Sequence, residues 1–147
     1  MAYEFKAVRL VEFSDTDMAG IVHYSNFFRY METAESGFFR SIGFSVVTDK
    51  TDPPIGLPRV HAECDYLEPL RFEDEVEIHM LVSDKKPKAL SYLFRFRKMN
   101  ALPRVEVARG KLTVVCVVHG PNGVMKATPI PKAVADRIEV APEELLK

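Results

Sequence analysis

The chain has 147 residues, of which 47% are hydrophobic and 28% are charged, a size and composition typical of one globular domain over residues 1–147. Its 20 basic and 21 acidic residues give a formal net charge of −1, which provides no overall positive field to attract nucleic acid or an anionic membrane. No stretch approaches the roughly 18 apolar residues of a membrane span, and the first residues lack the apolar core of a signal peptide, so the sequence predicts a cytoplasmic protein.

Two cysteines, Cys64 and Cys116, are too few for a disulfide framework. Each lies in an apolar stretch with the alternation of a strand, so we expect two reduced thiols in the core. The sequence shows no cluster of cysteine and histidine at zinc-binding spacing, and no metal site is predicted.

The first predicted element is a strand from Tyr3 to Phe13, in which apolar residues recur at every second position. Residues Ser14 to Val22 follow as a loop, because Asp, Ser, Thr and Gly are frequent there and favour turns. Ser25 is then placed to cap a helix that begins at residue 26, and Gly43 is placed to end it.

This helix is the longest predicted element and carries one apolar stripe, whose residues recur at spacings of three and four. Gly37 lies inside the helix, where it costs about 1 kcal/mol relative to Ala, and we expect it to allow close approach of another backbone. Four phenylalanines on one helix need a broad surface, such as a curved sheet, to bury them. The stripe consists of Phe27, Met31, Ala34, Phe38 and Ile42, widened by Phe28 and Phe39.

After the helix, residues 44–58 form a Pro-rich loop that we expect to fold over a pocket. The rest of the chain alternates in the manner of strands. A hairpin turn is indicated by Gly-Pro-Asn-Gly at residues 120–123, and a short terminal helix is predicted behind Pro142. The predicted strands are Arg59–Leu67, Glu75–Ser83, Leu90–Lys98 and Arg104–His119, with a turn at Asp84–Lys88.

One strand, one long helix and then a run of strands indicate an α+β fold with an antiparallel sheet. A single helix cannot cover both faces of such a sheet, and the strands at its edges leave backbone groups unpaired. We therefore expect dimers, formed edge to edge or face to face.

The segment from Asp15 to Asn26 leads directly into the long helix and has the clearest chemical potential. A helix N-terminus offers unpaired N–H groups and a partial positive charge, which suit a carbonyl oxygen that becomes an oxyanion. A carboxylate held nearby can attack an acyl carbon or activate a water, and Gly20 lets the backbone approach the substrate closely. The segment therefore supplies two parts of an acyl-transfer site.

Other interpretations of the Asp-x-Asp pattern must be weighed against this one. Asp15 or Asp17 can simply cap local backbone N–H groups, and this interpretation stays open. An EF-hand loop starting at Asp15 would need an oxygen ligand where Ala19 stands and a glutamate where Asn26 stands, so it fails. An aspartyl-phosphate nucleophile normally follows a buried parallel strand in an alternating α/β chain, a pattern that this sequence lacks.

The run FSDTDMAGIVHYSNFFRYMETAE resembles the signature of the 4-hydroxybenzoyl-CoA thioesterase family of hotdog proteins, and CDYLEPLRFEDEVEI is similar to that family's strand–Pro–strand segment. The resemblance implies a hotdog fold, in which a strongly curved antiparallel sheet wraps a long central helix. It also implies a homodimer or homotetramer with active sites at the subunit interface. The implied substrate is a small-molecule acyl-CoA, with no cofactor beyond the coenzyme A of that substrate.

The same resemblance assigns roles to residues of the loop. Asp17 matches the family's catalytic carboxylate, which serves as nucleophile or general base. Tyr24 matches the position whose backbone N–H, at the start of the helix, polarises the thioester carbonyl. The substrate-binding positions are predicted to be Gly20, Ile21, Val22 and His23.

Several polar residues have simpler interpretations. Asp15 is expected to cap the loop, and Glu35 to be a polar or interface residue of the helix. His61 and His79 are expected to be solvated or to lie at an interface. For His23, a role in the pocket and a packed structural role both stay open.

An acyl-CoA thioester hydrolase is therefore the leading functional hypothesis. A hotdog hydratase or dehydratase acting on acyl thioesters is one alternative, with His23 and Glu35 as its His–carboxylate pair. A non-catalytic acyl-CoA-binding module is the other. Met18, Phe27, Phe28 and the Pro-rich loop are expected to line an apolar acyl pocket, and the sequence does not identify the acyl group.

Overall fold

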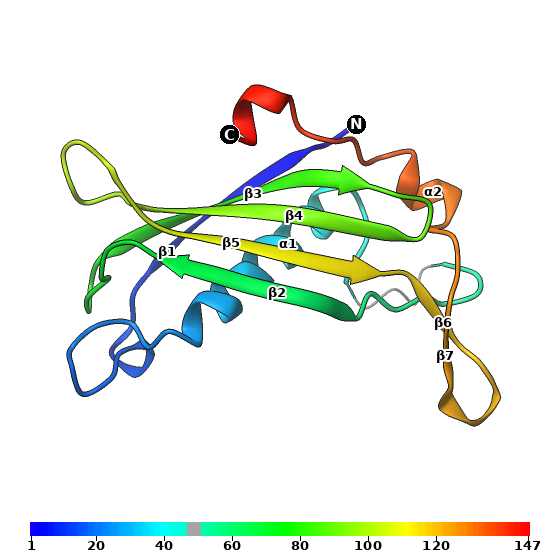
Figure 1. Ribbon diagram of the computed structural model, residues 1–147, viewed down its shortest axis with the longest axis horizontal. Coiled ribbons are helices and arrows are strands. Elements are labelled where there is room, and N and C mark those ends of the chain that lie inside the picture. Colours follow the sequence, from blue (N-terminus) through cyan, green and yellow to red (C-terminus); the bar gives the residue numbers. More distant parts are fainter. Residues whose placement is uncertain (47–50) are drawn as a thin grey trace.

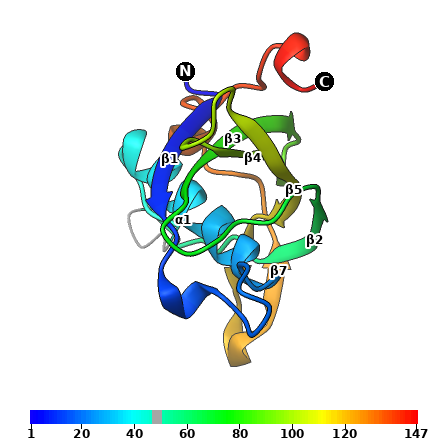
Figure 2. The same ribbon diagram turned by 90° about the vertical axis from the view of Figure 1, so that its left-hand side faces the viewer.

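Five antiparallel strands form the main sheet of the computed structural model, which describes residues 1–46 and 51–147. Helix α1 (Asn26–Ser41) lies behind the sheet in Figure 1, and the end view in Figure 2 shows the sheet curving around it. This confirms the predicted α+β architecture of a long helix wrapped by a curved antiparallel sheet. Across the sheet, the order is β1 (Glu4–Leu10), β3 (Glu75–Lys85), β4 (Ala89–Lys98), β5 (Val105–Val115) and β2 (Arg59–Tyr66).

The core lies between α1 and the concave face of the sheet. The predicted stripe of α1 is buried from Phe27 to Phe38, whereas Ile42, just beyond the helix, is half-buried. The sheet wraps the helix so widely that Tyr30 and Glu35, which lie outside the stripe, are also buried. The facing side chains of the sheet are Val76, Ile78, Met80 and Val82 from β3, and Tyr92, Phe94 and Phe96 from β4.

Gly37 marks the closest approach between α1 and β1. A Cβ atom at this position would lie 2.3 Å from Cε2 and 2.6 Å from Cζ of the Phe5 ring, distances that real Cβ atoms essentially never show. The close neighbour is therefore a side chain of β1, not the backbone that the sequence analysis expected. Position 37 is a glycine because the Phe5 ring leaves no space for a Cβ atom, not because the backbone there needs the conformational freedom of glycine.

We expect Gly37→Ala to lower the free energy of unfolding by about 1–3 kcal/mol, the usual cost of overpacking, although alanine is the better helix former. Urea denaturation followed by circular dichroism measures the change. The control is Ser36→Ala, at the neighbouring half-buried position, where we expect little change. Adding Phe5→Leu to Gly37→Ala should restore most of the stability, and a Gly37→Ala protein as stable as the wild type would contradict this packing argument.

The predicted strand Arg104–His119 is divided in two. β5 ends at Val115, and the backbone N–H of Cys116 then donates a hydrogen bond to the turn before β4, so the chain turns away from the sheet. β6 (Val117–His119) pairs instead with β7 (Met125–Ala127) in a hairpin that projects from the body in Figure 1. The predicted hairpin turn at residues 120–123 is confirmed.

Two short segments complete the described chain. Helix α2 (Lys132–Ala135) follows the hairpin, and a single 3₁₀ turn (Glu143–Leu145) stands where a terminal helix was expected behind Pro142. The Pro-rich loop does not fold over a pocket in its described part, because Ile55 and Leu57 are buried in the core. Residues 47–50 of that loop lie outside the described residues.

Both cysteines are free thiols. Cys116 is buried as predicted, whereas Cys64 is only half-buried, because β2 is an edge strand. None of the described helices is long and apolar enough to cross a membrane. Within residues 1–46 and 51–147, no group of three or more His, Cys, Asp or Glu side chains is arranged to hold a metal ion.

The convex face of the sheet contains a buried histidine. His79 Nε2 lies 2.6 Å from Glu4 Oε2, and its Nδ1 lies 3.2 Å from Arg97 Nη1. Burial lowers the pKa of His79, although Glu4 opposes this effect. The expectation of a solvated His79 is therefore wrong, because these neighbours cover it. His61 is exposed as expected, 3.0 Å from Glu63 Oε1.

Candidate active site

Asp15 anchors the loop between β1 and α1. Its Oδ2 accepts hydrogen bonds from the backbone N–H of Glu12 at 2.9 Å and from the Tyr30 hydroxyl at 3.0 Å. Its backbone carbonyl accepts from the His23 backbone N–H at 2.9 Å and from the Asn26 side chain at 2.8 Å. Asp15 is 8% exposed and has the structural role that the sequence predicted, because it ties both ends of the loop to α1.

Removing the Tyr30 hydroxyl tests this anchor. Burial, and then the hydrogen bond to Asp15, raise the pKa of Tyr30, so the phenol stays protonated and can donate. We expect Tyr30→Phe to lower the free energy of unfolding by about 1–3 kcal/mol, because a buried carboxylate oxygen loses a donor. Denaturant titration measures the loss. Tyr24→Phe, which removes an exposed tyrosine hydroxyl, is the control, and equal stability of both variants would contradict the anchoring role.

Asp17 stands in a tight turn directly after this anchor. Its backbone N–H donates to the Ile21 carbonyl at 2.9 Å, and its carbonyl accepts from the Gly20 N–H at 2.9 Å. Gly20 has a φ of +80°, a conformation that favours glycine. Asp17 Oδ1 accepts the Ala19 N–H at 2.8 Å, and Oδ2 has no hydrogen-bond partner among the described residues. The half-buried carboxylate therefore has one oxygen held and one oxygen available.

The start of α1 lies beside this turn. Ser25 is the N-cap residue, as predicted, but its hydroxyl does not cap the helix and instead lies 2.8 Å from His23 Nδ1. The His23 ring stacks on the Tyr24 ring, with 4.5 Å between the ring centroids. In the part of the chain that the structure describes, the backbone N–H of Tyr24 donates to no acceptor. The positive end of α1 thus offers a free donor.

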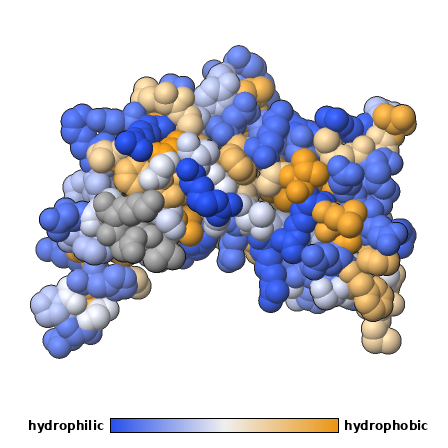
Figure 3. Space-filling model, turned by 180° about the vertical axis from the view of Figure 1, so that it is seen from behind, coloured by the Kyte–Doolittle hydropathy of each residue, from blue (hydrophilic) through white to orange (hydrophobic). Residues whose placement is uncertain are grey.

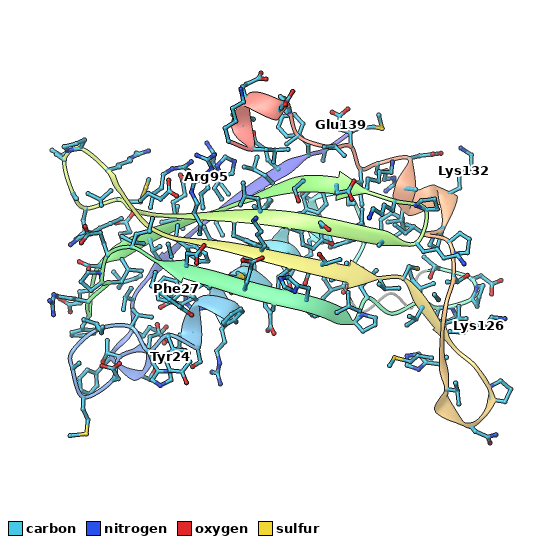
Figure 4. The ribbon with its side chains drawn as sticks, in the orientation of Figure 1. Tyr24, Phe27, Arg95, Lys126, Lys132 and Glu139 are labelled. Atoms are coloured by element: carbon cyan, nitrogen blue, oxygen red, sulfur yellow. The ribbon has the colours of Figure 1, made fainter. Side chains whose placement is uncertain are left out.

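A cavity of about 460 Å³ opens between the turn and the helix start. Of the predicted site residues, Asp17, Ile21, Val22 and Tyr24 line it together, whereas Gly20 and His23 do not. Figure 4 shows Tyr24 and Phe27 at the same end of the molecule, beneath the end of β2. The other lining residues are Phe27, Tyr66, Leu67, Glu68, Pro69 and Leu70.

The wall from Tyr66 to Leu70 is absent from the predicted site residues. The Tyr66 hydroxyl donates to the Tyr24 carbonyl at 3.0 Å, and the Tyr66 ring meets Phe27 edge-on at 5.2 Å. The Leu70 carbonyl accepts the Val22 N–H at 2.8 Å. The only sequence signal for this wall is its place in the family-like run CDYLEP, which indicates a fold but no contact with the loop.

Among the described residues that were expected to line an apolar pocket, only Phe27 does so. Phe27 faces the cavity, whereas the side chain of Met18 is exposed to solvent and Phe28 packs against the core elsewhere. The described part of the Pro-rich loop contributes no lining residue.

Glu35, which the sequence analysis expected to be a polar or interface residue, lies in the interior of the chain. Its side chain is 0% exposed, and Oε1 pairs with Arg59 Nη2. Burial raises the pKa of Glu35 to about 7, although Arg59 lowers it. His23 contacts Ser25 and Tyr24 instead, so the His–carboxylate pair of the hydratase alternative is not formed.

Comparison with known proteins places the chain in a family. The model of the thioesterase-like superfamily matches residues 11–138. A curated protein of Aquifex aeolicus (strain VF5), provisionally named an esterase, is 34% identical over 128 residues, which cover 87% of this chain and 92% of that protein. The 1,4-dihydroxy-2-naphthoyl-CoA hydrolase of Microcystis aeruginosa is 26% identical over 133 residues, which cover 90% of this chain and 88% of that protein.

Solved structures agree with this assignment. A gentisyl-coenzyme A thioesterase has a TM-score of 0.73 at 31% identity, covering 90% of this chain and 97% of its own. The 4-hydroxybenzoyl-CoA thioesterase of Pseudomonas sp. strain CBS-3 has a TM-score of 0.83 over 92% of this chain and 99% of its own, and its 19% identity makes this a likeness of fold. The predicted hotdog fold is confirmed, and the chain belongs to the thioesterase-like superfamily.

Proposed function

We propose that this chain hydrolyses an acyl-CoA thioester to a free acid and coenzyme A, with Asp17 as the catalytic carboxylate. The observation that carries the proposal is that the available oxygen of Asp17 and the free N–H of Tyr24 belong to residues lining one cavity. Relatives that are named as hydrolases of CoA thioesters support the reaction class.

In the proposed reaction, the thioester carbonyl accepts a hydrogen bond from the Tyr24 N–H. The positive end of α1 stabilises the negative charge that develops on this oxygen. Asp17 acts on the acyl carbon, either directly or through a water that it deprotonates. Water supplies the second oxygen of the acid, and the sulfur of coenzyme A leaves and takes up a proton. The route uses protein groups and water, and coenzyme A enters as part of the substrate.

A single turnover in H₂¹⁸O can establish direct attack by Asp17. Direct attack forms an anhydride between Asp17 and the acyl group, and water attack at the Asp17 carbonyl would leave ¹⁸O in the protein. General-base catalysis places ¹⁸O only in the released acid, as does water attack at the acyl carbonyl of the anhydride, so label in the protein is the result that identifies direct attack. Mass spectrometry of the peptide that contains Asp17 reads out the label.

We infer that the acyl group is aromatic. The aromatic residues Tyr24, Phe27 and Tyr66 line the cavity, and the remaining wall is largely apolar. Aromatic rings favour offset or edge-to-face contacts with centroids about 4.5–7 Å apart, which three rings around one cavity can provide. The gentisyl-CoA and dihydroxynaphthoyl-CoA relatives support this class of acyl group.

Free-thiol release from a panel of acyl-CoAs tests both parts of the proposal. The panel contains benzoyl-, 4-hydroxybenzoyl-, gentisyl- and 1,4-dihydroxy-2-naphthoyl-CoA, with acetyl-, butyryl- and decanoyl-CoA for comparison. We expect kcat/KM to be at least about 10-fold higher for the aromatic group, equivalent to about 1.4 kcal/mol of barrier. A preference for an aliphatic chain would reject the aromatic assignment, and no hydrolysis at all would favour the hydratase or binding-module alternatives.

We further propose that copies of this chain pair through β2. This edge strand is exposed along nearly its whole length. Antiparallel pairing centred on Ala62 would set His61 of each copy opposite Glu63 of the other, and a cross-strand contact between an imidazole and a carboxylate is favourable. Light scattering should therefore give a multiple of the 16.7 kDa chain mass, and a monomer at micromolar concentration would contradict the pairing.

A further inference from the structure

A second depression, separate from the acyl cavity, follows the exposed face of α1 beside β1. Its volume is about 790 Å³ and its lining is polar. Figure 3 views the protein from the side of α1 and shows strongly hydrophilic residues near the middle of this face. We call this depression the arginine groove, and its lining residues are Arg9, Asp15, Arg29, Glu32, Thr33, Ser36 and Arg40.

The helix supplies one ridge of the arginine groove. Arg29, Thr33, Ser36 and Arg40 follow one another at spacings of four, three and four residues, so they lie on one line along α1. With a rise of 1.5 Å per residue, the two arginines stand about 17 Å apart along the axis. The side chains of Thr33 and Ser36 between them are short, so the middle of the ridge projects less than its ends. The ridge therefore has a positive charge at each end and hydroxyl groups between.

Arg9 reaches the middle of the groove from β1. Its guanidinium carbon lies 5.1 Å from the centroid of the Tyr30 ring, and its Nη1 lies 3.4 Å from Thr33 Oγ1. The cation–π contact and the hydroxyl hold this half-buried side chain in place before any ligand arrives. A preorganised side chain loses less entropy on binding.

The three arginines of the groove differ from most arginines of the sheet outside the groove in having no carboxylate partner. Arg59, Arg97 and Arg109 each pair with a glutamate. Among the described residues, none of the three arginines of the groove forms an ion pair. Of the two acids in the groove, Asp15 already accepts hydrogen bonds from Glu12 and Tyr30, and Glu32 is exposed. Positive charge is therefore in excess.

The charges of the arginine groove favour binding of an anion over packing against helix α1 of a second copy. Antiparallel packing of two such helices about the midpoint of the ridge would set Arg29 of one copy opposite Arg40 of the other. Like charges at such a contact are unfavourable. Planar guanidinium groups match the oxygens of phosphate in a bidentate manner, and three of them around one groove can hold more than one phosphate.

We propose that the arginine groove binds the phosphate groups of a nucleotide, and that in the reaction proposed above these are the phosphates of coenzyme A. The assignment of these phosphates to coenzyme A depends on that proposed function. The groove and the acyl cavity both border the loop before α1, because Asp15 lines the groove and Asp17 the cavity. On α1 itself, Phe27 faces the cavity and Arg29 faces the groove on the other side of the helix. In the proposed binding mode, an acyl-CoA with its acyl group in the cavity passes around the start of α1 and places its phosphates in the groove.

Binding of adenosine 3′,5′-bisphosphate, measured by isothermal titration calorimetry, tests the groove without catalysis. The double variant Arg29→Gln/Arg40→Gln should bind at least about 10-fold more weakly than the wild type. Lys88→Gln/Arg104→Gln removes the same charge from exposed positions outside the groove and should bind within twofold of the wild type. Thermal melting confirms that both variants are folded. No binding by the wild type, or equal binding by the groove variant, would overturn the proposal.

Inorganic phosphate is the second probe. If the nucleotide is the ligand, phosphate should compete at least about 10-fold more weakly than the bisphosphate. Equal affinity for the two would overturn the nucleotide assignment in favour of a free-phosphate site. A changed molecular mass of the groove variant in light scattering, with bisphosphate affinity unchanged, would also overturn the proposal, because the face would then be an interface between copies.

Kinetics with two carriers separate this proposal from the proposed function. For the preferred acyl group on coenzyme A, the groove variant should show a KM at least about 10-fold higher, with kcat within twofold. The same acyl group on pantetheine, which lacks the nucleotide, should give unchanged kinetics. If the groove variant hydrolyses acyl-CoA with an unchanged KM, the proposal that the groove binds the nucleotide is overturned, and the proposed thioesterase activity is not affected. Bisphosphate binding that depends on Arg29 and Arg40, without hydrolysis of any thioester, would support the groove and contradict the thioesterase.

Discussion

Replacing Asp17 with asparagine should lower kcat for thioester hydrolysis by at least 100-fold, or about 2.7 kcal/mol of barrier. Asparagine keeps the size of the side chain and can still accept the Ala19 N–H, so the turn should persist. It removes the charge, and an amide can neither attack an acyl carbon well nor take a proton from water. Free-thiol release from the best substrate of the acyl-CoA panel measures the effect.

The matched control for this variant is Asp84→Asn, which makes the same change at an exposed position of β3 and should leave kcat unchanged. Thermal melting of both variants shows whether the fold is kept. If Asp17→Asn hydrolyses at the wild-type rate, Asp17 is not part of the mechanism. Attention would then move to Glu68, the other carboxylate that lines the cavity.

Glu35→Gln should raise the free energy of unfolding at pH 8 by up to about 3 kcal/mol. Burial raises the pKa of Glu35 to about 7, from 4.5 in the absence of the fold. The folded protein therefore binds this proton more tightly than the unfolded chain. The contribution of Glu35 to stability is greatest below pH 4.5 and is lost as the pH rises through 7. Glutamine resembles the protonated acid and avoids the cost of a buried charge.

Urea denaturation between about pH 5 and pH 8 measures this difference. The stability gap between variant and wild type should widen with pH and become constant above the pKa of Glu35. Glu144→Gln, which makes the same change at an exposed position far from Glu35 in the sequence, should show no such widening. A Glu35→Gln protein that is less stable than the wild type at pH 8 would mean that the ion pair with Arg59 outweighs the cost of burial.

Local sequence patterns were sufficient to predict the helix, the loop and the role of Asp15. The period of the apolar stripe depends only on residues within α1, and the loop residues are turn-forming in any context. Asp15 is bound mainly by residues of its own loop and of the first turns of α1, so its role is also local. The lining of the cavity by Asp17 and Tyr24 follows from the same short segment.

Features that depend on distant residues could not be predicted from such patterns. Glu35 is buried because the sheet curves far around α1, and its partner Arg59 belongs to β2. His79 is buried because Glu4 from β1 and Arg97 from β4 lie on either side of it. Alternation along one strand shows which residues share a face, but not what covers that face.

The long predicted strand Arg104–His119 illustrates a further limit. An apolar run such as VVCVV continues through residue 116 without a break in pattern. The division between β5 and β6 arises from hydrogen bonds to other segments, which turn the chain at Cys116 toward β7. Periodicity alone contains no information about these partners.

The cavity combines the proposed reactive groups, which come from one segment, with a wall from another. Asp17 and the Tyr24 N–H belong to the loop before α1, whereas residues 66–70 form the opposing wall after β2. Leu70 is joined to the loop through its backbone carbonyl and packs its side chain in the core, whereas the side chain of Leu67 in the same wall is exposed. If the proposed reaction is right, mutations at the exposed positions of this wall can alter acyl-group preference while the loop that would perform the hydrolytic step is preserved, which would give the scaffold a simple evolutionary route to new substrates.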